Sequence, residues 1–174
     1  MPSEVPRKKN ALYWIEKLNL QPHIEGGHYR EIYRSSCIIS QSSLPAAFSG
    51  DRHIATSIYF LLEAGRYSSF HKILSDETWH FYAGDCLLIY EITEEGSLNT
   101  HRLGKDPEKM EHFQVIIPAG HWFAARPDHG TDYALVGCTV SPGFNFSDFE
   151  LAKGDELTKR FPAHRELILE LSSE

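Results

Sequence analysis

Short runs of β-branched and aromatic residues alternate with turn-forming residues from Gly26 to about Pro142. The runs that predict strands are 28–35, 53–63, 66–72, 77–82, 86–92, 97–103, 112–117, 121–126 and 131–140. Glycine, proline, aspartate and serine separate most of these runs, and such residues supply the backbone conformations of tight turns. Many short strands at nearly even spacing, with no helical pattern between them, predict an all-β sandwich or barrel.

Helical patterns are confined to the two ends of the chain. After Asn10, a candidate N-cap, four apolar residues recur at helical spacing and predict a short amphipathic helix. These residues are Ala11, Trp14, Ile15 and Leu18. Near the other end, apolar residues beside glutamates predict a helical tail over 154–173 that packs on the outside of the strands. Residues 36–50 are a polar loop of small residues, either a flap over a site or a plain surface loop.

Length and composition indicate one domain. The 174 residues, 41% of them hydrophobic, suffice for one core and are too few for two domains. We therefore expect a single domain over residues 1–174, with its core at about 10–152 and the helical tail after it.

Charge and apolar patterning argue against several partners. The net charge is −7, the only basic run is Arg7-Lys8-Lys9, and nucleic-acid binding needs clustered Lys and Arg, so no nucleic acid is expected. No apolar stretch approaches the roughly 20 residues of a membrane helix, and MPSEVPRKKN lacks the apolar segment of a signal peptide. Cys37, Cys86 and Cys138 form no CxxC, which indicates reduced thiols in a cytoplasmic protein, the last two buried in strands.

Candidate chemistry is concentrated in residues 65–85, GRYSSFHKILSDETWHFYAGD. Alternate residues of a strand share a face, so Glu77, Trp79 and Phe81 point the same way on one predicted strand. His71 and Ile73 share one face at the end of the strand before it. The residues that point the opposite way are His80 and Tyr82. Ten histidines and 12% aromatic residues suit a concave, partly apolar pocket, and suit an ordinary all-β core equally well.

The spacing in this stretch resembles the first motif of the cupin superfamily, G-x5-H-x-H-x3-E-x6-G. The residues that occupy its fixed positions are Gly65, His71, Glu77 and Gly84. Ile73 stands where the motif has its second histidine. Residues 118–123, PAGHWF, resemble the second motif, P-x-G-x2-H, with Phe123 in place of the histidine.

The chain is similar to one subfamily in particular, the uncharacterised cupins called cupin type 5. The stretches that carry this resemblance are PHIEGGHYRE with Tyr33-Arg34-Ser35, SDETWH at 75–80 and GCTVSPGF at 137–144. The resemblance covers roughly residues 10–152. It implies a jelly-roll barrel (a double-stranded β-helix), a homodimer, and kinship with the nucleotide-sugar epimerase branch of cupins. It implies no particular reaction, because the subfamily has no generally established one.

The resemblance also bears on metal binding. Metal-dependent cupins hold their ion with three histidines and a glutamate, of which this chain keeps His71 and Glu77 and replaces the others with Ile73 and Phe123. Two protein ligands are too few for a well-held transition metal, so no cofactor is expected. The alternative is a shifted site of His71, Glu77 and His121, because strand parity places His121 on the inner face with Phe123.

Without a metal, His71 and Glu77 suit acid–base chemistry. A buried histidine and glutamate must be paired or hydrogen-bonded, and such a pair has shifted pKa values that suit proton transfer. The related epimerases use a histidine base and a tyrosine acid, and several strand tyrosines of this chain are candidates for that acid: Tyr29, Tyr59, Tyr90 and Tyr133. A purely structural His71–Glu77 pair is the alternative.

Other residues are candidates for ligand binding. Arg30 and Arg34 lie four apart on one predicted strand face, where they could bind a phosphate or carboxylate or make surface or interface pairs. Several aromatic residues could stack on a planar or sugar ligand, or pack in the core: Trp79, Phe81, Trp122 and Phe123.

The sequence thus predicts a protein that binds a small polar molecule, such as a sugar or nucleotide-sugar, in a barrel. The leading hypothesis is a metal-independent isomerase or epimerase with His71 and Glu77 as catalytic residues. The residues expected to bind the ligand are Tyr29, Arg30, Trp79, Phe81, His121 and Phe123. The alternatives are a non-catalytic binding module and a metal-dependent cupin enzyme.

Overall fold

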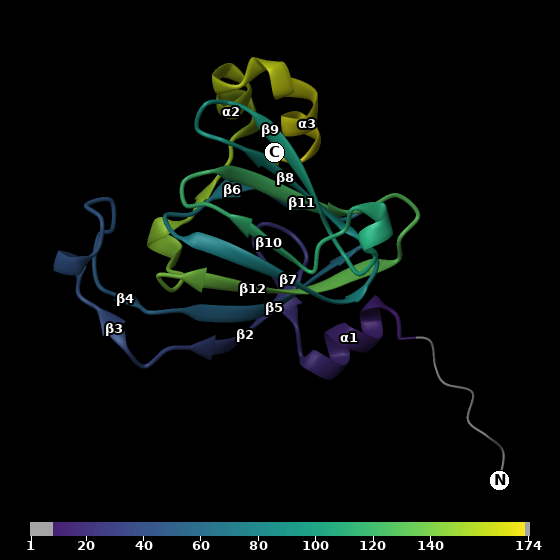
Figure 1. Ribbon diagram of the computed structural model, residues 1–174, viewed down its shortest axis with the longest axis horizontal. Helices are drawn as coiled ribbons and strands as arrows, with labels where there is room; N and C mark the ends of the chain where they lie inside the picture. The colour runs from purple at the N-terminus through teal and green to yellow at the C-terminus, as the bar shows by residue number, and fades with distance from the viewer. Residues whose placement is uncertain (1–8, 173–174) are drawn as a thin grey trace, which may run out of the picture.

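The computed structural model describes residues 9–172, so that Arg7 and Lys8 of the basic run lie outside the described residues. Two main sheets face each other (Figure 1). The six-stranded sheet has the order β1 (Gln21–Pro22), β2 (His28–Arg34), β5 (Thr56–Glu63), β12 (Tyr133–Ser141), β7 (Asp76–Gly84) and β10 (Gln114–Ile117). The five-stranded sheet has the order β13 (Glu150–Leu151), β6 (Ser68–Lys72), β11 (Trp122–Pro127), β8 (Leu87–Ile92) and β9 (Leu98–Leu103).

Strands that follow each other in the chain mostly belong to opposite sheets. From β5 to β13 the chain changes sheet at every step except between β8 and β9, and all the pairings in these two sheets are antiparallel. This alternation winds the chain around a shared interior and makes a jelly roll. The predicted all-β double-stranded β-helix is therefore confirmed.

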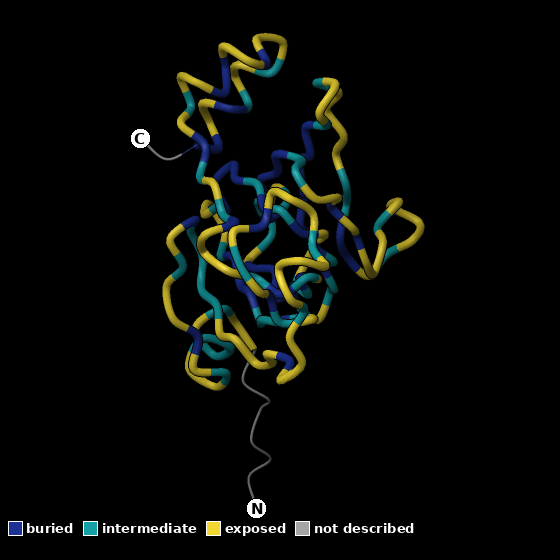
Figure 2. The backbone as a smooth tube through the Cα atoms, turned by 90° about the vertical axis from the view of Figure 1, so that its left-hand side faces the viewer, coloured by how far each residue is buried: buried dark blue, intermediate teal, exposed yellow. Residues whose placement is uncertain are grey.

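The core lies between the two sheets, where the strands carry their inward side chains. Figure 2 shows that buried segments gather in the body and that most loops are exposed. Strand β8 is buried along its whole length, because Leu87 and Ile89 point into the barrel while Leu88 and Tyr90 pack under the C-terminal helices. A strand covered on both faces shows no hydrophobic alternation in sequence.

Helices cover the outside of the barrel at both predicted places. Helix α1 (Ala11–Leu18) begins at Asn10, whose side chain accepts a hydrogen bond of 3.0 Å from the backbone N–H of Tyr13. Helices α2 (Gly154–Arg160) and α3 (Arg165–Glu170) pack on the outer face of the five-stranded sheet. Among the described helices, none is long and apolar enough to span a membrane.

The predicted loop over 36–50 belongs to a projecting segment. Strands β3 (Ile38–Ile39) and β4 (Arg52–His53) form a separate two-stranded sheet, and a short 3-10 helix lies between them. We refer to residues 36–55 as the arm; Figure 1 shows it at the left, away from the two main sheets. The run 53–63, predicted as one strand, is therefore divided between the arm and β5.

Candidate functional site

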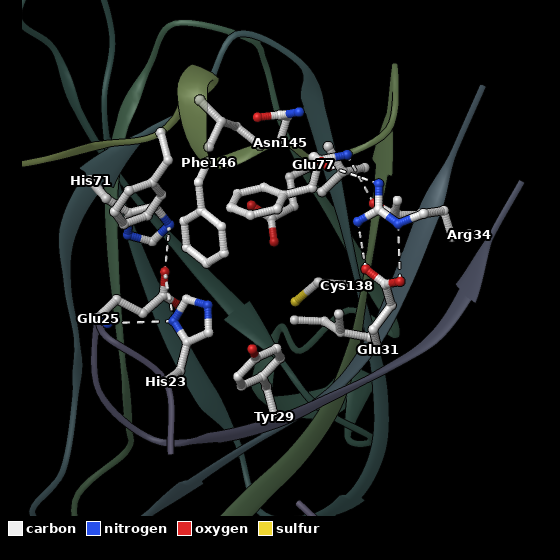
Figure 3. A pocket seen from close by; sticks show the side chains of 16 residues that line it. His23, Glu25, Tyr29, Glu31, Arg34, His71, Glu77, Cys138, Asn145 and Phe146 are labelled. Carbon is white, nitrogen blue, oxygen red and sulfur yellow. Dashed lines mark hydrogen bonds and ion pairs between the residues drawn. The ribbon is translucent and has the colours of Figure 1, made fainter. Parts of the chain in front are cut away.

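A cavity of about 290 Å³ lies between the sheets, and Figure 3 shows the side chains that line it. It opens to solvent beside Glu31, Arg34 and Phe146, whose side chains are exposed. Its lining comes from β2, β5, β7 and β12 of one sheet, from His71 of β6 and the adjoining Ile73, and from segments 23–25 and 144–149. Residues that are remote in the sequence therefore meet around one concave volume, which is the usual form of a small-molecule site.

A turn with two glycines brings Glu25 into this cavity. Gly26 and Gly27 have φ values of 113° and 70°, which side-chain-bearing residues rarely adopt. A Cβ atom on Gly26 would lie 2.1 Å from the carbonyl oxygen of Tyr67, so the turn packs directly on the start of β6. The backbone N–H of Ser69 donates to the carbonyl of Glu25 at 2.8 Å and fixes this approach.

The Glu25 carboxyl lies between two histidines. Its Oε2 is 3.2 Å from Nε2 of His71 and 3.6 Å from Nδ1 of His23, while its Oε1 accepts a hydrogen bond of 2.9 Å from Ser68. The side chains of Glu25 and His71 are only 9% and 3% exposed. Water therefore contributes little to their solvation, and the two groups depend on each other.

Backbone contacts decide which nitrogen of His71 carries the proton. Nδ1 lies 2.7 Å from the carbonyl oxygen of Ser69, which can only accept, so Nδ1–H is the donor. In the neutral ring the Nε2 lone pair then faces Glu25. Burial lowers the pKa of His71 to about 4, and burial raises the pKa of Glu25 against the opposing effects of His23 and Ser68. At neutral pH the His71 imidazole is therefore neutral, and the Glu25 carboxyl keeps its proton to a higher pH than an exposed glutamate does.

Glu77 lines the same cavity as a neutral acid. Burial, followed by the nearby Glu25 carboxyl, raises the pKa of Glu77 to about 8, although a hydrogen bond with Cys138 opposes the shift. The carboxyl is therefore mostly protonated at neutral pH and can donate a hydrogen bond or a proton. Burial also raises the pKa of the Cys138 thiol, which leaves Cys138 a neutral part of the wall.

Both predicted catalytic residues thus line the cavity, but their predicted pairing is corrected. The carboxyl that faces His71 belongs to Glu25, and Glu77 has its hydrogen bond with Cys138. Neither His23 nor Glu25 was predicted as a site residue, because both precede the first long strand. The signal that could have found them is the stretch PHIEGG, which contributed to the family resemblance.

Tyr29 is the candidate tyrosine that lines the cavity. Its ring lies edge-on to His23, with ring centroids 4.6 Å apart. The other three candidates have contacts elsewhere. Tyr59 packs in the apolar cluster that α1 covers, and the hydroxyls of Tyr90 and Tyr133 accept hydrogen bonds from Arg126 and Trp14.

The two strand arginines separate. A register shift between Glu31 and Tyr33 marks a β-bulge in β2, and the bulge turns Arg34 toward the cavity while Arg30 stays outside. Arg30 is exposed and donates to the carbonyl of Leu18. The predictions that the two arginines share a face and that Arg30 contacts the ligand are therefore wrong.

Three aromatic residues predicted as ligand contacts belong to the core. Trp79 and Phe123 are each 1% exposed within the inner cluster, and Phe81 packs against that cluster, so none of the three lines the cavity. Phe123 instead supports His71 from behind, with ring centroids 4.1 Å apart. The outward orientation predicted for His80 fits its hydrogen bond of 3.1 Å with Thr139.

His121 lies just before β11 and away from the cavity lining. Its Nδ1 is 2.6 Å from Oε1 of Glu91, whose Oε2 is 2.7 Å from Nε2 of His101. The prediction that His121 joins the site, as a ligand contact or as part of a shifted metal site, is therefore wrong.

The remaining residues do not fit the metal that many cupins hold. Ile73 lines the cavity without a donor atom, and the two ring nitrogens of His71 already face Ser69 and Glu25. Within residues 9–172, no group of three or more His, Cys, Asp or Glu side chains is arranged to hold a metal ion. This donor set supports proton transfer among side chains.

Comparisons with known proteins agree with this architecture. Residues 12–152 match the protein family described as Cupin superfamily (DUF985). The uncharacterised protein YML079W of Saccharomyces cerevisiae is 28% identical over 157 residues, which are 83% of this chain and 76% of the yeast protein.

Solved structures show the same fold. Protein SO0799 from Shewanella oneidensis is 41% identical, with a TM-score of 0.85 over 94% of this chain and 98% of that one. A hypothetical protein from Leishmania major is 32% identical, with a TM-score of 0.85 over 95% of this chain and 99% of that one. Oxalate decarboxylase from Bacillus subtilis is 16% identical, with a TM-score of 0.52 over 86% of this chain and 36% of that enzyme, a likeness of fold alone.

Proposed function

The chain belongs to the DUF985 family of the cupin superfamily, and we propose that its cavity binds a small polar carbonyl compound and isomerises or epimerises it without a metal. The observation that carries the proposal is the buried Glu25–His71 pair in one cavity with a protonated Glu77. Environments that move the pKa values of neighbouring groups in opposite directions are typical of acid–base catalysis.

The reaction that suits these groups is a proton shift beside a carbonyl. The Glu25 carboxyl takes the proton from the carbon next to the carbonyl and passes a proton on to Nε2 of His71, 3.2 Å away. Glu77 gives its proton to the carbonyl oxygen, which produces an enediol. The carbonyl of Ser69 holds Nδ1–H of the resulting imidazolium and keeps the ring in place.

The return step completes the shift with all protons accounted for. The Glu25–His71 pair returns a proton to the former carbonyl carbon. The Glu77 carboxylate takes the proton of the hydroxyl on the adjacent carbon, which becomes the new carbonyl. The product is an isomer, and both acids regain their starting states. For epimerisation Tyr29, in the cavity wall, gives its proton to the same carbon from the opposite face, and Glu77 regains its proton from the enediol hydroxyl. The Glu25–His71 pair then releases its extra proton to water and the Tyr29 phenolate takes one up from water, which restores the starting state.

Deuterium exchange tests this proposal without a known substrate. The protein is incubated in D2O with a bacterial small-molecule extract, and mass spectrometry follows compounds that gain deuterium on carbon. We expect a wild-type-dependent gain that falls by about 100-fold or more in Glu25→Gln, Glu77→Gln and His71→Ala, since single acid–base groups contribute on the order of 10²–10⁴ in rate. Circular dichroism confirms that each variant is folded.

Glu16→Gln, an exposed change on α1, is the matched control and should exchange as wild type does. Two results contradict the proposal. Full exchange in both folded Glu25→Gln and Glu77→Gln would remove these residues from the chemistry. A compound that is retained by the protein but gains no deuterium would identify a non-catalytic binding module.

A further inference from the structure

The mouth of the cavity holds an ion pair that only an irregular strand could place there. Glu31 and Arg34 are three residues apart, and in a regular strand such residues point to opposite faces. The bulge in β2 removes this constraint, so both side chains line the cavity. Bulges that aim a side chain at a site are a recurrent device in sheets.

The bonds of Arg34 hold the pair in one geometry. Its Nε and Nη2 donate to the two oxygens of Glu31 at 3.0 and 2.6 Å, and Nη1 donates to the carbonyl of Phe144 at 3.2 Å. A guanidinium has five N–H groups, so donors remain beside the further lone pairs of the carboxylate. The pair therefore presents donors and acceptors side by side to the cavity mouth.

The charge of Arg34 is already balanced before any ligand arrives. Arg34 is the sole lysine or arginine among the described residues that line the cavity. Burial lowers the pKa of His71 and, despite the raising effect of Glu25, the pKa of His23, so neither ring adds a lasting positive charge at neutral pH. A phosphate or carboxylate at the mouth would face the Glu31 carboxylate across hydrogen-bonding distance, and like charges repel.

An aromatic wall stands beside this pair. The rings of Phe144, Phe146 and Phe149 are 5.0 to 6.2 Å apart, and all three line the cavity. Phe146 is 55% exposed, although large apolar side chains are more often covered. Hydroxyl groups both donate and accept, and the C–H face of a sugar ring is apolar, so a sugar matches both halves of the mouth.

We infer that this rim, made of Glu31, Arg34 and the three phenylalanines, binds an uncharged polyhydroxyl group such as a sugar ring. Glu31 excludes phosphorylated or otherwise anionic ligands, because it occupies Arg34. The inference rests on the proposed function in taking this cavity as the ligand site. It narrows the ligand from sugars and nucleotide-sugars in general to sugars that present no phosphate at the rim.

Calorimetric titration with inorganic pyrophosphate tests the exclusion. Wild type should give no saturable binding of pyrophosphate at millimolar concentrations. Glu31→Gln releases the Arg34 guanidinium, so this variant should bind pyrophosphate at least about tenfold more tightly than wild type does. Adding Arg34→Met to Glu31→Gln should abolish the gain. Glu16→Gln raises the net charge equally, away from the cavity, and should behave as wild type does.

Pyrophosphate binding by wild type through Arg34, or no gain in Glu31→Gln, overturns the role of Glu31. A second measurement tests the ligand class by saturation-transfer NMR with neutral glucose, galactose, mannose, rhamnose and ribose. At least one sugar should give a signal that Phe146→Ala weakens, and silence from all five overturns the assignment. Neither measurement depends on proton transfer, so the inference can fail while the proposed reaction stands, and the reverse also holds.

Discussion

Glu25 and Glu77 keep their protons to a higher pH than glutamates in water do, and burial is the main cause for both. Glu25 and Glu77 are each only 8% exposed, so water hydrates their carboxylates poorly, and the Glu25 carboxyl further disfavours a charge on Glu77. The fold therefore supplies one acid, Glu77, that still holds its proton near neutral pH, and a second, Glu25, whose pKa is raised in the same direction.

The raised pKa of Glu77 makes stability depend on pH. Between the ordinary pKa of 4.5 and about 8, the folded state retains a proton that the unfolded state releases, so rising pH destabilises the fold across this window. Glu77→Gln removes this dependence. As pH rises from 4.5 to 8, we expect the free energy of unfolding of the variant to gain a few kcal/mol on that of wild type, at about 1.4 kcal/mol per unit of pKa difference.

Urea unfolding of both proteins at a series of pH values measures this difference. Parallel stability curves for wild type and Glu77→Gln would show that the Glu77 carboxyl ionises in the folded state as it does in water.

The turn that delivers Glu25 depends on the absence of a side chain at Gly26. Gly26→Ala should lower the free energy of unfolding by about 3 kcal/mol or more, because Cβ would collide with the Tyr67 carbonyl at an unfavourable φ. Gly130→Ala is the matched control: its φ of 79° is strained too, but no atom lies within 4 Å of the added Cβ. Gly130→Ala should lower the free energy of unfolding by only about 1 kcal/mol. Equal losses in thermal denaturation would contradict the steric argument.

The arm and the cavity wall are joined by one buried ion pair. Arg52 of β4 donates through Nε to Oδ2 of Asp148 at 2.6 Å and through Nη2 to the other carboxylate oxygen. Both side chains are only 4% exposed. Asp148 ends the 3-10 helix Phe146–Asp148, so the pair links the arm to the segment that carries Phe146 into the rim.

Breaking this pair should loosen both segments. Asp148→Asn leaves the Arg52 charge buried without its carboxylate. We expect the free energy of unfolding to fall by about 3 kcal/mol and proteolysis of the arm to become faster. Glu150→Gln breaks the more exposed Lys72–Glu150 pair and should cost less than about 1 kcal/mol. A similar effect of both substitutions would mean that burial of the pair contributes nothing.

In the barrel as a whole, the packed core and the cavity occupy different parts of one interior. Inward side chains of the two sheets form one core, and the cavity occupies one end of the same interior. Phe123 fills a position at which many cupins carry a metal ligand, and it packs on His71. The Phe123 ring therefore occupies the space beside His71 without offering a donor atom.

The homodimer expected from the sequence stays a prediction. Apolar residues are exposed on β2 and the arm, with Tyr33 at 55% and Ile38 at 60% exposed, and such residues suit a contact between copies. Light scattering should give twice the chain mass of 19.9 kDa. A single-chain mass at micromolar concentration would contradict the expectation.

Much of this protein follows from local patterning. Strand order along the chain, the Asn10 cap, the C-terminal helices and the buried Cys86 and Cys138 are confirmed, because burial periodicity and turn residues act over a few neighbours. The motif also places His71 and Glu77 in one cavity, since an inward-facing residue remains inward wherever pairing is regular.

The contacts of the site depend on the folded chain. A strand register shift in β2 turns Arg34 inward and leaves Arg30 outside, and strand parity cannot foresee such a shift. The partner of His71 is Glu25, which arrives through a turn packed against β6 rather than along a strand. Side-chain partners across a barrel are set by packing between distant segments, and sequence spacing carries no record of that distance.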